Sequence, residues 1–131
     1  MSGKATGTFG VKAFDEETLT EYEHGGKLSR ARIVQTYSGD LDGELTADLV
    51  MHYHADGTAE FLGYQRFVGR IGDRAGSFVM TAAGAYDSAA AKTECIIIAG
   101  SGTDDFEGFT GRGDATVGHG ADAGHYTLDY A

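Results

Sequence analysis

Six polar side chains lie among apolar residues in strand-like stretches, and their types suit hydrogen bonding to a small organic molecule. They are Gln35, Tyr37, Tyr53, Gln65, Cys95 and Tyr126. A phenol or a carboxamide can polarise a carbonyl group or orient it without a cofactor. We expect Gln65 and Tyr37 to be catalytic, and Tyr53, Tyr126, Gln35 and Cys95 to bind the substrate. The alternative is that the tyrosines are core residues whose hydroxyl groups reach water at the ends of the domain.

Two other patterns resemble catalytic motifs but lack essential parts. Cys95 lies in an apolar run, where burial raises a thiol pKa and makes it inert, and no histidine stands in an adjacent position to act as its base. Gly100-Ser101-Gly102-Thr103 has neither the lysine of a phosphate-binding loop nor the strand-turn-helix setting of a hydrolase serine. We therefore interpret it as a turn stiffened by side-chain hydrogen bonds.

The pair His52 and His54 has the spacing of half a cupin metal site. Histidines two residues apart lie on one face of a strand and can chelate a transition metal. However, the proline and the third histidine of that motif have no counterpart, and His52 shares a charged face with Glu44 and Asp48. We expect no metal and no cofactor. Glu44, Arg66 and Glu107 are further polar groups. A carboxylate that is desolvated at the barrel mouth can act as a general base, and the alternative is an external ion pair.

The elements that position these side chains are β-strands, since apolar and polar residues alternate along most of the chain. The clearest alternation, over 43–54, places Leu45, Leu49 and Met51 on one face. Asp56-Gly57 predicts a hairpin turn. The eight predicted strands cover 6–14, 28–38, 43–54, 58–71, 76–86, 92–99, 112–118 and 124–130. Residues 15–27 are predicted to be a loop, with at most a helical turn over 16–22.

This strand count predicts an all-β fold, a closed eight-stranded antiparallel barrel that spans residues 1–131 as one domain. A closed barrel has no free edges, and it encloses one space that side chains or a small ligand fill. Strand 92–99 is apolar on both faces, so its outer side is expected to be covered. The predicted apolar lining consists of Phe9, Val11, Ile33, Leu45, Leu49, Met51, Phe61, Phe67, Phe78, Met80, Ile97, Val117 and Leu128. Five of these are also expected to bind the substrate: Met51, Phe61, Phe67, Phe78 and Met80.

The charge and the apolar content narrow the expected partners. A net charge of −10 disfavours nucleic acid and anionic membranes. The longest apolar run, over 95–99, is too short to span a bilayer. The beginning of the sequence lacks the apolar stretch of a signal peptide, and the single cysteine fits a reducing compartment. These features predict a cytoplasmic protein, and a homodimer is left open.

The C-terminal third carries the most specific pattern: Gly100-Ser101-Gly102-Thr103, then Gly108-Phe109-Thr110-Gly111-Arg112-Gly113, then Tyr126-Thr127-Leu128-Asp129-Tyr130. Together with Asp56-Gly57-Thr58 this resembles the DUF3224 family of small bacterial proteins of unassigned function. The resemblance implies a barrel of the allene oxide cyclase and dirigent type. The chain departs from the family pattern at Cys95, Ala99, Gln65 and Ala82, where relatives often have tryptophan, proline, glutamate and histidine. These departures predict a remodelled and roomier interior.

From the residues and the resemblance, we expect a cofactor-independent cyclase or isomerase that acts on a small, largely apolar molecule, of the kind found in natural-product metabolism. The barrel would hold a flexible substrate in a reactive shape. One alternative is a carrier that binds the same molecule without chemistry. Another is a filled barrel that acts through its surface, as a homo-oligomer or a regulatory partner. An inward ionisable group with a strongly shifted pKa would favour the enzyme, and a uniformly apolar lining would favour the carrier.

Overall fold

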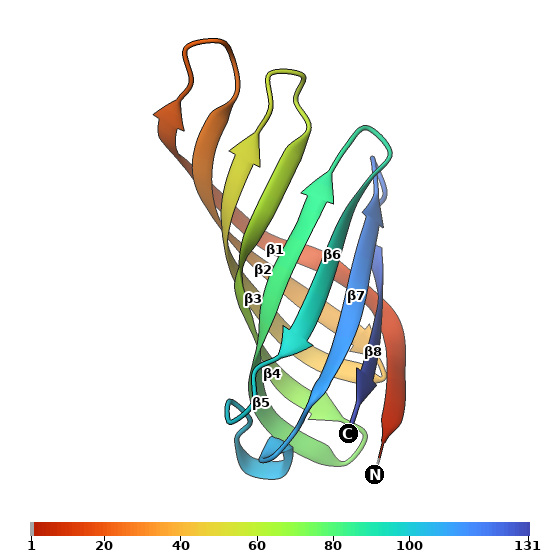
Figure 1. Ribbon diagram of the computed structural model, residues 1–131. Helices are drawn as coiled ribbons and strands as arrows, with labels where there is room; N and C mark the ends of the chain where they lie inside the picture. Colours follow the sequence, from red (N-terminus) through yellow and green to blue (C-terminus); the bar gives the residue numbers. More distant parts are fainter. Residues whose placement is uncertain (1) are drawn as a thin grey trace.

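The chain forms a closed barrel in which buried and exposed residues alternate along most of the strands. The computed structural model describes residues 2–131, in which eight antiparallel strands pair in sequence order and β8 returns to β1 (Figure 1). This confirms the predicted fold. The strands are β1 (Gly3–Glu21), β2 (Lys27–Gly39), β3 (Leu41–Tyr53), β4 (Ala59–Ile71), β5 (Arg74–Tyr86), β6 (Ala90–Ile97), β7 (Gly111–Gly118) and β8 (Gly124–Tyr130).

The predicted alternation holds well in β3. Leu45, Leu49 and Met51 are buried in the barrel, whereas Asp48 and Val50 are exposed on the outside. Because paired residues of neighbouring strands share a face, the β3–β4 register also turns Phe61, Gln65 and Phe67 inward. The sequence pattern therefore fixes which side chains line the interior of this wall.

One end of the barrel is closed by aromatic side chains. The connection between β6 and β7 contains a short 3-10 helix, η1 (Asp104–Phe106), and it crosses the lower end in Figure 1. Phe106 and Phe109 from this connection pack against Phe78, with ring centroids 5.2 and 5.3 Å away. Arg74 lies over the Phe109 ring, 5.0 Å from its centroid. These contacts form a dense plug, so access to the interior must come from the opposite end.

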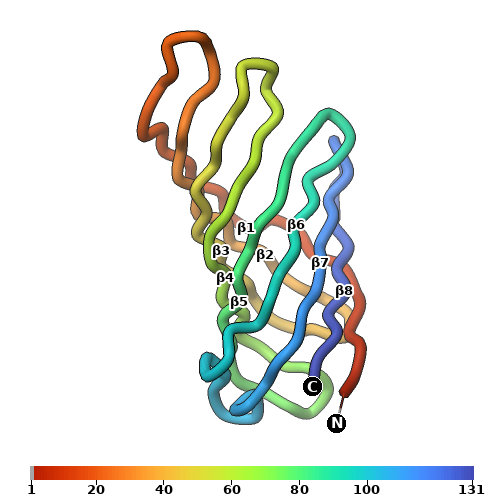
Figure 2. Tube along the Cα trace, viewed as in Figure 1, coloured from red at the N-terminus to blue at the C-terminus, as the bar shows by residue number. Residues whose placement is uncertain are grey.

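The opposite end is open, and there the prediction of a loop over residues 15–27 is wrong. β1 continues to Glu21 and pairs with β2 as far as Lys27, whereas β8 pairs with β1 only up to Phe9. The second half of β1 therefore has hydrogen-bonded neighbours on one side only, and the barrel keeps a free edge there. In Figure 2 the β1–β2 and β3–β4 hairpins extend to the upper left, beyond the closed part of the barrel.

Two further expectations are corrected by the burial. Val11, predicted to face the core, is 59% exposed, because β8 has ended opposite Phe9 and the β1–β2 register shifts between Val11 and Ala13. The outer side of β6 is not covered either, since Ile96 is 49% exposed. Within residues 2–131, no helix has the length and the apolar character that a membrane crossing requires.

Candidate functional site

The open end of the barrel contains a cavity of about 380 Å³ with a mostly apolar wall. This volume lies at the lower end of the range typical of small-molecule pockets. Strands β1 to β7 all contribute to the wall. The lining residues are Phe9, Phe14, Ile33, Gln35, Tyr37, Ala47, Leu49, Met51, Tyr53, Phe61, Gln65, Ala82, Tyr86, Ala91, Thr93, Ala115 and Val117. We call this space the mouth cavity.

Tyr37 lies at the inner end of the mouth cavity and presents a polar group there. Its ring stacks on Phe9 at a centroid distance of 5.0 Å and contacts Tyr126 at 4.9 Å, so the side chain is held firmly. Among residues 2–131 its hydroxyl group has no hydrogen-bond partner. Burial, with smaller effects from the nearby Cys95 and Tyr126, raises the pKa of Tyr37. The phenol therefore stays protonated and can donate a hydrogen bond to a ligand.

Gln65 lies near Tyr37 on the cavity wall and is oriented by Cys95. Its Nε2 atom donates a hydrogen bond to Cys95 Sγ at 2.8 Å, and both side chains are buried. The Oε1 atom has no partner among the described residues, so it can accept a hydrogen bond from a ligand. Burial raises the pKa of the Cys95 thiol to about 12, which makes it a poor nucleophile at neutral pH.

Cys95 itself does not border the mouth cavity. It lies below the cavity beside a second void of only about 20 Å³, together with Met80 and Tyr126. Tyr37 and Gln65 border both spaces. The thiol therefore supports Gln65 from behind and does not reach the mouth cavity, where it was predicted to bind the substrate.

An exposed carboxylate, Glu16, lies at the rim of the mouth cavity, outside its lining and in contact with the lining residue Tyr53. Glu16 shares the inner face of the sheet with its neighbour across the strands, Ala31. Its Oε2 atom accepts hydrogen bonds from the Tyr53 hydroxyl at 2.7 Å and from the Ser29 hydroxyl at 2.5 Å. Burial and the hydrogen bond to Glu16 raise the pKa of Tyr53 to about 12, so this phenol remains a donor at neutral pH.

Four other predicted binding residues, Tyr126, Phe67, Phe78 and Met80, lie away from the mouth cavity, Met80 beside the small void. Tyr126 accepts a hydrogen bond from the Leu41 N–H at 2.8 Å and donates one to the Ser38 carbonyl at 2.8 Å. Its hydroxyl group therefore ties β8 to the β2–β3 turn and is not free for a ligand. Phe67 and Phe78 are fully buried in the aromatic plug. In contrast, the predicted residues Gln35, Met51, Tyr53 and Phe61 all border the cavity.

The remaining motifs have structural partners. His52 and His54 lie on the outer face, where Nδ1 of His52 is 3.0 Å from the Tyr22 hydroxyl and Nε2 of His54 is 2.9 Å from Glu60. In the described part of the chain, no three His, Cys, Asp or Glu side chains are gathered as around a metal ion. Ser101 stiffens its turn as predicted, because its hydroxyl donates to the Ile98 carbonyl at 2.7 Å.

The other charged groups singled out in the sequence lie on the outer surface. Glu44 forms an exposed ion pair with Lys12 at 2.9 Å, which agrees with the second alternative. Arg66 donates a hydrogen bond to the Ser77 hydroxyl at 3.2 Å, and Glu107 is exposed beside η1. An exposed pair of this kind contributes little to stability. None of the three borders the mouth cavity.

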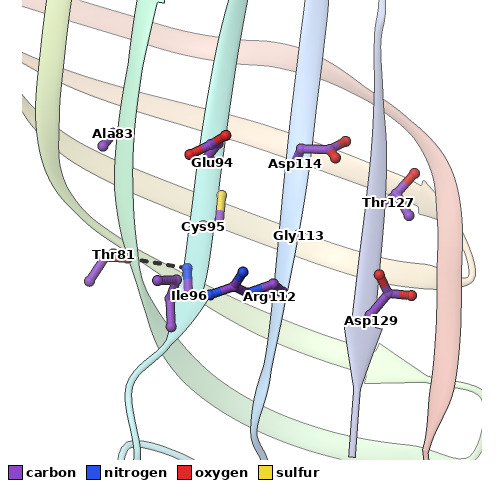
Figure 3. A pocket seen from close by; sticks show the side chains of 10 residues that line it. All are labelled: Thr81, Ala83, Glu94, Cys95, Ile96, Arg112, Gly113, Asp114, Thr127 and Asp129. Atoms are coloured by element: carbon purple, nitrogen blue, oxygen red, sulfur yellow. Dashed lines mark hydrogen bonds between the residues drawn. The ribbon is translucent and has the colours of Figure 1, made fainter.

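A shallow groove of about 290 Å³ on the outer wall crosses β5 to β8 (Figure 3). Glu94, Asp114 and Asp129 surround it, with Arg112 between them, so its surface is charged. Its side walls are exposed strand residues. The mouth cavity lies inside the barrel and has a mostly apolar wall, and it is therefore the better candidate site.

Sequence reasoning missed two parts of this site. The sequence predicts Phe14 at the end of a strand and Glu16 in a loop, because the acidic stretch that follows Phe14 shows no alternation of apolar and polar residues. Tyr86 and Thr93 border the cavity as well, from the β5–β6 hairpin. The Tyr86 signal was present in the sequence, since Tyr86 has the same parity along β5 as the inward-facing Ala82 and Met80.

Comparisons with known proteins agree with this fold. No functionally curated protein matches the chain. The crystal structure of a protein of unknown function from the DUF3224 family of Shewanella oneidensis MR-1 is similar, with a TM-score of 0.82 and 22% sequence identity over 100% of this chain and 98% of that chain. The model of the DUF3224 family, described as a protein of unknown function, matches residues 5–130. The chain therefore belongs to the DUF3224 family, as its sequence motifs predicted.

Proposed function

We propose that the protein binds one small, largely apolar organic molecule in the mouth cavity and promotes its cyclisation or isomerisation without a cofactor. The observation that carries the proposal is the pair of unsatisfied polar groups in an apolar cavity, the Tyr37 hydroxyl and Gln65 Oε1. Both atoms are open to the cavity, so a ligand can replace water as their hydrogen-bond partner and be oriented by them.

Each group has a distinct role in this proposal. The neutral Tyr37 phenol donates to a carbonyl oxygen of the substrate and stabilises the negative charge that develops there as a hydroxyl group of the same molecule adds to the carbonyl carbon. The C=O π bond breaks as the new C–O bond forms, and the hydroxyl proton passes to the former carbonyl oxygen, so that the ring closure balances within the substrate. Gln65 Oε1 accepts a hydrogen bond from a hydroxyl or enol of the same substrate. The apolar wall, with Met51 and Phe61, folds the rest of the molecule into a compact shape, which contributes by proximity.

A carrier that returns its ligand unchanged is the second candidate. It is favoured by the absence of an activated nucleophile at the inner end of the cavity, where the Cys95 pKa is raised to about 12 and the Tyr37 pKa is raised by burial. The enzyme is favoured by the donor and the acceptor that face the same apolar cavity, the Tyr37 hydroxyl and Gln65 Oε1, which can polarise and orient a substrate. Both candidates use the same cavity, so the distinction lies in what happens to the bound molecule.

A ligand that co-purifies with the protein separates the two candidates. Native mass spectrometry of the protein from its own cells identifies the mass of the bound molecule. Because cyclisation and isomerisation conserve mass, an enzyme would convert the isolated molecule, or its open-chain isomer, into a species of equal mass and different chromatographic retention. Tyr37→Phe should slow this conversion. A ligand recovered unchanged, with no isomer formed on prolonged incubation, would establish the carrier.

The cavity itself is tested by a matched pair of variants. Ala82 is buried and borders the mouth cavity, whereas its neighbour Ala83 is exposed on the outer face. Ala82→Trp should abolish the fluorescence enhancement of the hydrocarbon probe diphenylhexatriene, and Ala83→Trp should leave it intact. Circular dichroism of both variants shows whether the barrel is retained. Equal probe binding by the two folded variants would contradict the proposed site.

A further inference from the structure

At the rim of the mouth cavity, the Glu16 carboxylate accepts internal hydrogen bonds on only one of its two oxygen atoms. Both internal hydrogen bonds of Glu16 end on Oε2, from Tyr53 and from Ser29. The second oxygen, Oε1, has no hydrogen-bond partner among residues 2–131. Since Ser29 is fully buried and Tyr53 is half-buried, these two bonds fix the direction of the carboxylate. Oε1 is therefore a preoriented acceptor at the entrance to an apolar space.

The charged neighbours of Glu16 leave its charge unpaired. None of the ion pairs in the described chain includes Glu16. Arg30 pairs with Glu17 at 3.9 Å, and Arg32 pairs with Asp48 at 2.8 Å. A further basic group at the rim, Lys27, lies over the Tyr53 ring, 5.1 Å from its centroid. With a net charge of −10 over the whole chain, the rim attracts cations and repels anions.

The rim and the inner end of the cavity lie at different depths. Gln65 pairs with Ala47, and Tyr53 stands six residues further along β3. Six residues of strand span about 20 Å. The wall between the two levels is apolar and includes Leu49, Met51 and Phe61. A molecule that reaches both levels must therefore have an apolar body with a polar group at the end nearest the rim.

We propose that Glu16, held by Tyr53 and Ser29, binds a hydrogen-bond-donating head group of an amphipathic ligand whose apolar body fills the mouth cavity. A protonated amine is the preferred head, because a charge-assisted hydrogen bond to a carboxylate is about twice as strong as a neutral one. A hydroxyl group fits the same acceptor less tightly, and a carboxylate head is rejected. The inference rests on the proposed occupation of the cavity and adds the class of ligand.

Competition against diphenylhexatriene tests the head group with three ligands of equal chain length, decylamine, decan-1-ol and decanoate, at pH 7. The expected order of affinity is amine, alcohol, carboxylate, with about tenfold between the amine and the carboxylate. Glu16→Gln should reduce that ratio to about twofold or less while diphenylhexatriene itself binds as before. Glu17→Gln is the matched control, because it removes the same charge from the outer face and should keep the full ratio.

The outcomes separate the inference from the proposed function. If diphenylhexatriene does not bind the wild-type protein, the proposed function fails. If the probe binds but the three ligands compete equally, the cavity stands and the head-group inference is overturned. Equal loss of preference in Glu16→Gln and Glu17→Gln would assign the preference to overall charge and would also overturn it.

Discussion

Tyr37 and Tyr126 provide a matched test of which phenol faces the cavity. Both side chains are 5% exposed, and their rings are in contact at a centroid distance of 4.9 Å. The substitution of either by phenylalanine removes one oxygen atom from a similar environment. The structure assigns opposite roles to the two oxygens, so the two variants should differ in both stability and binding.

The expected magnitudes follow from the hydrogen bonds. In Tyr126→Phe the Leu41 N–H and the Ser38 carbonyl both lose their bond to the phenol. Loss of such bonds, with a buried donor left unsatisfied, costs about 2 kcal/mol, which for a domain of this size lowers the melting temperature by about 6–10 °C. In Tyr37→Phe no internal hydrogen bond is lost, so the free energy of unfolding should change by less than about 0.5 kcal/mol.

The assay combines thermal unfolding, followed by circular dichroism, with the affinity for a ligand that carries a carbonyl group. Tyr37→Phe should keep the wild-type melting temperature and lower the affinity for the carbonyl ligand. It should leave the affinity for diphenylhexatriene unchanged. Tyr126→Phe should show the reverse, a lower melting temperature with ligand discrimination intact. If Tyr37→Phe unfolds as early as Tyr126→Phe, the Tyr37 hydroxyl makes an internal bond, and its proposed role is wrong.

Four more outcomes follow from the structure. With a pKa raised to about 12, Cys95 should resist a disulfide reagent such as DTNB at pH 8 in the native protein and react fully after denaturation, and equal rates would contradict its burial. The Arg32 hydrogen bond and charge lower the pKa of Asp48 below its ordinary value, so its contribution to stability is present above about pH 4 and is lost as the pH falls through the lower folded value; the melting temperature should fall less steeply on acidification in Asp48→Asn than in the wild-type protein. The outer face of β4 exposes Leu62 by 65% and Tyr64 by 61%, so Leu62→Lys should change the free energy of unfolding by less than about 0.5 kcal/mol; a larger loss in thermal unfolding would contradict the exposure of this face. Amides of β1 that point to its free edge beyond Phe9 should exchange with deuterium faster than those of β3, and equal protection would show that the edge is covered.

The inward-facing residues of β3 to β5 could be predicted because one face of these strands is buried in the barrel and the other is exposed to solvent. Leu45, Leu49 and Met51 alternate with Asp48 and Val50, so the period of two and the inward face could both be derived from the sequence. The second half of β1 could not be derived. Its residues are exposed along the whole stretch from Val11 to Glu21, and pairing with β2 on one side is what keeps them extended.

The candidate site was predictable only in part, for the same reason. Tyr37, Tyr53 and Gln65 lie on the consecutive strands β2, β3 and β4. Apolar and polar residues alternate along these strands, and this alternation predicts that the three side chains face inward. Glu16 belongs to the stretch without a pattern, and its role depends on the β1–β2 register and on Tyr53, 37 residues away. The occupation of the Tyr126 hydroxyl depends on contacts 85 and 88 residues distant, which no local pattern could indicate.

The methionine methyl groups allow the central claim, that the mouth cavity holds one small apolar molecule, to be tested directly. The chain has three methionines. Of these, Met51 borders the mouth cavity, whereas Met80 borders the small void below it. In an NMR titration of protein with 13C-labelled methionine methyl groups, assigned with Met51→Leu, we predict that decylamine produces a saturable shift of the Met51 resonance at one equivalent, with a smaller shift of Met80. An unchanged Met51 resonance at saturating ligand would contradict the account.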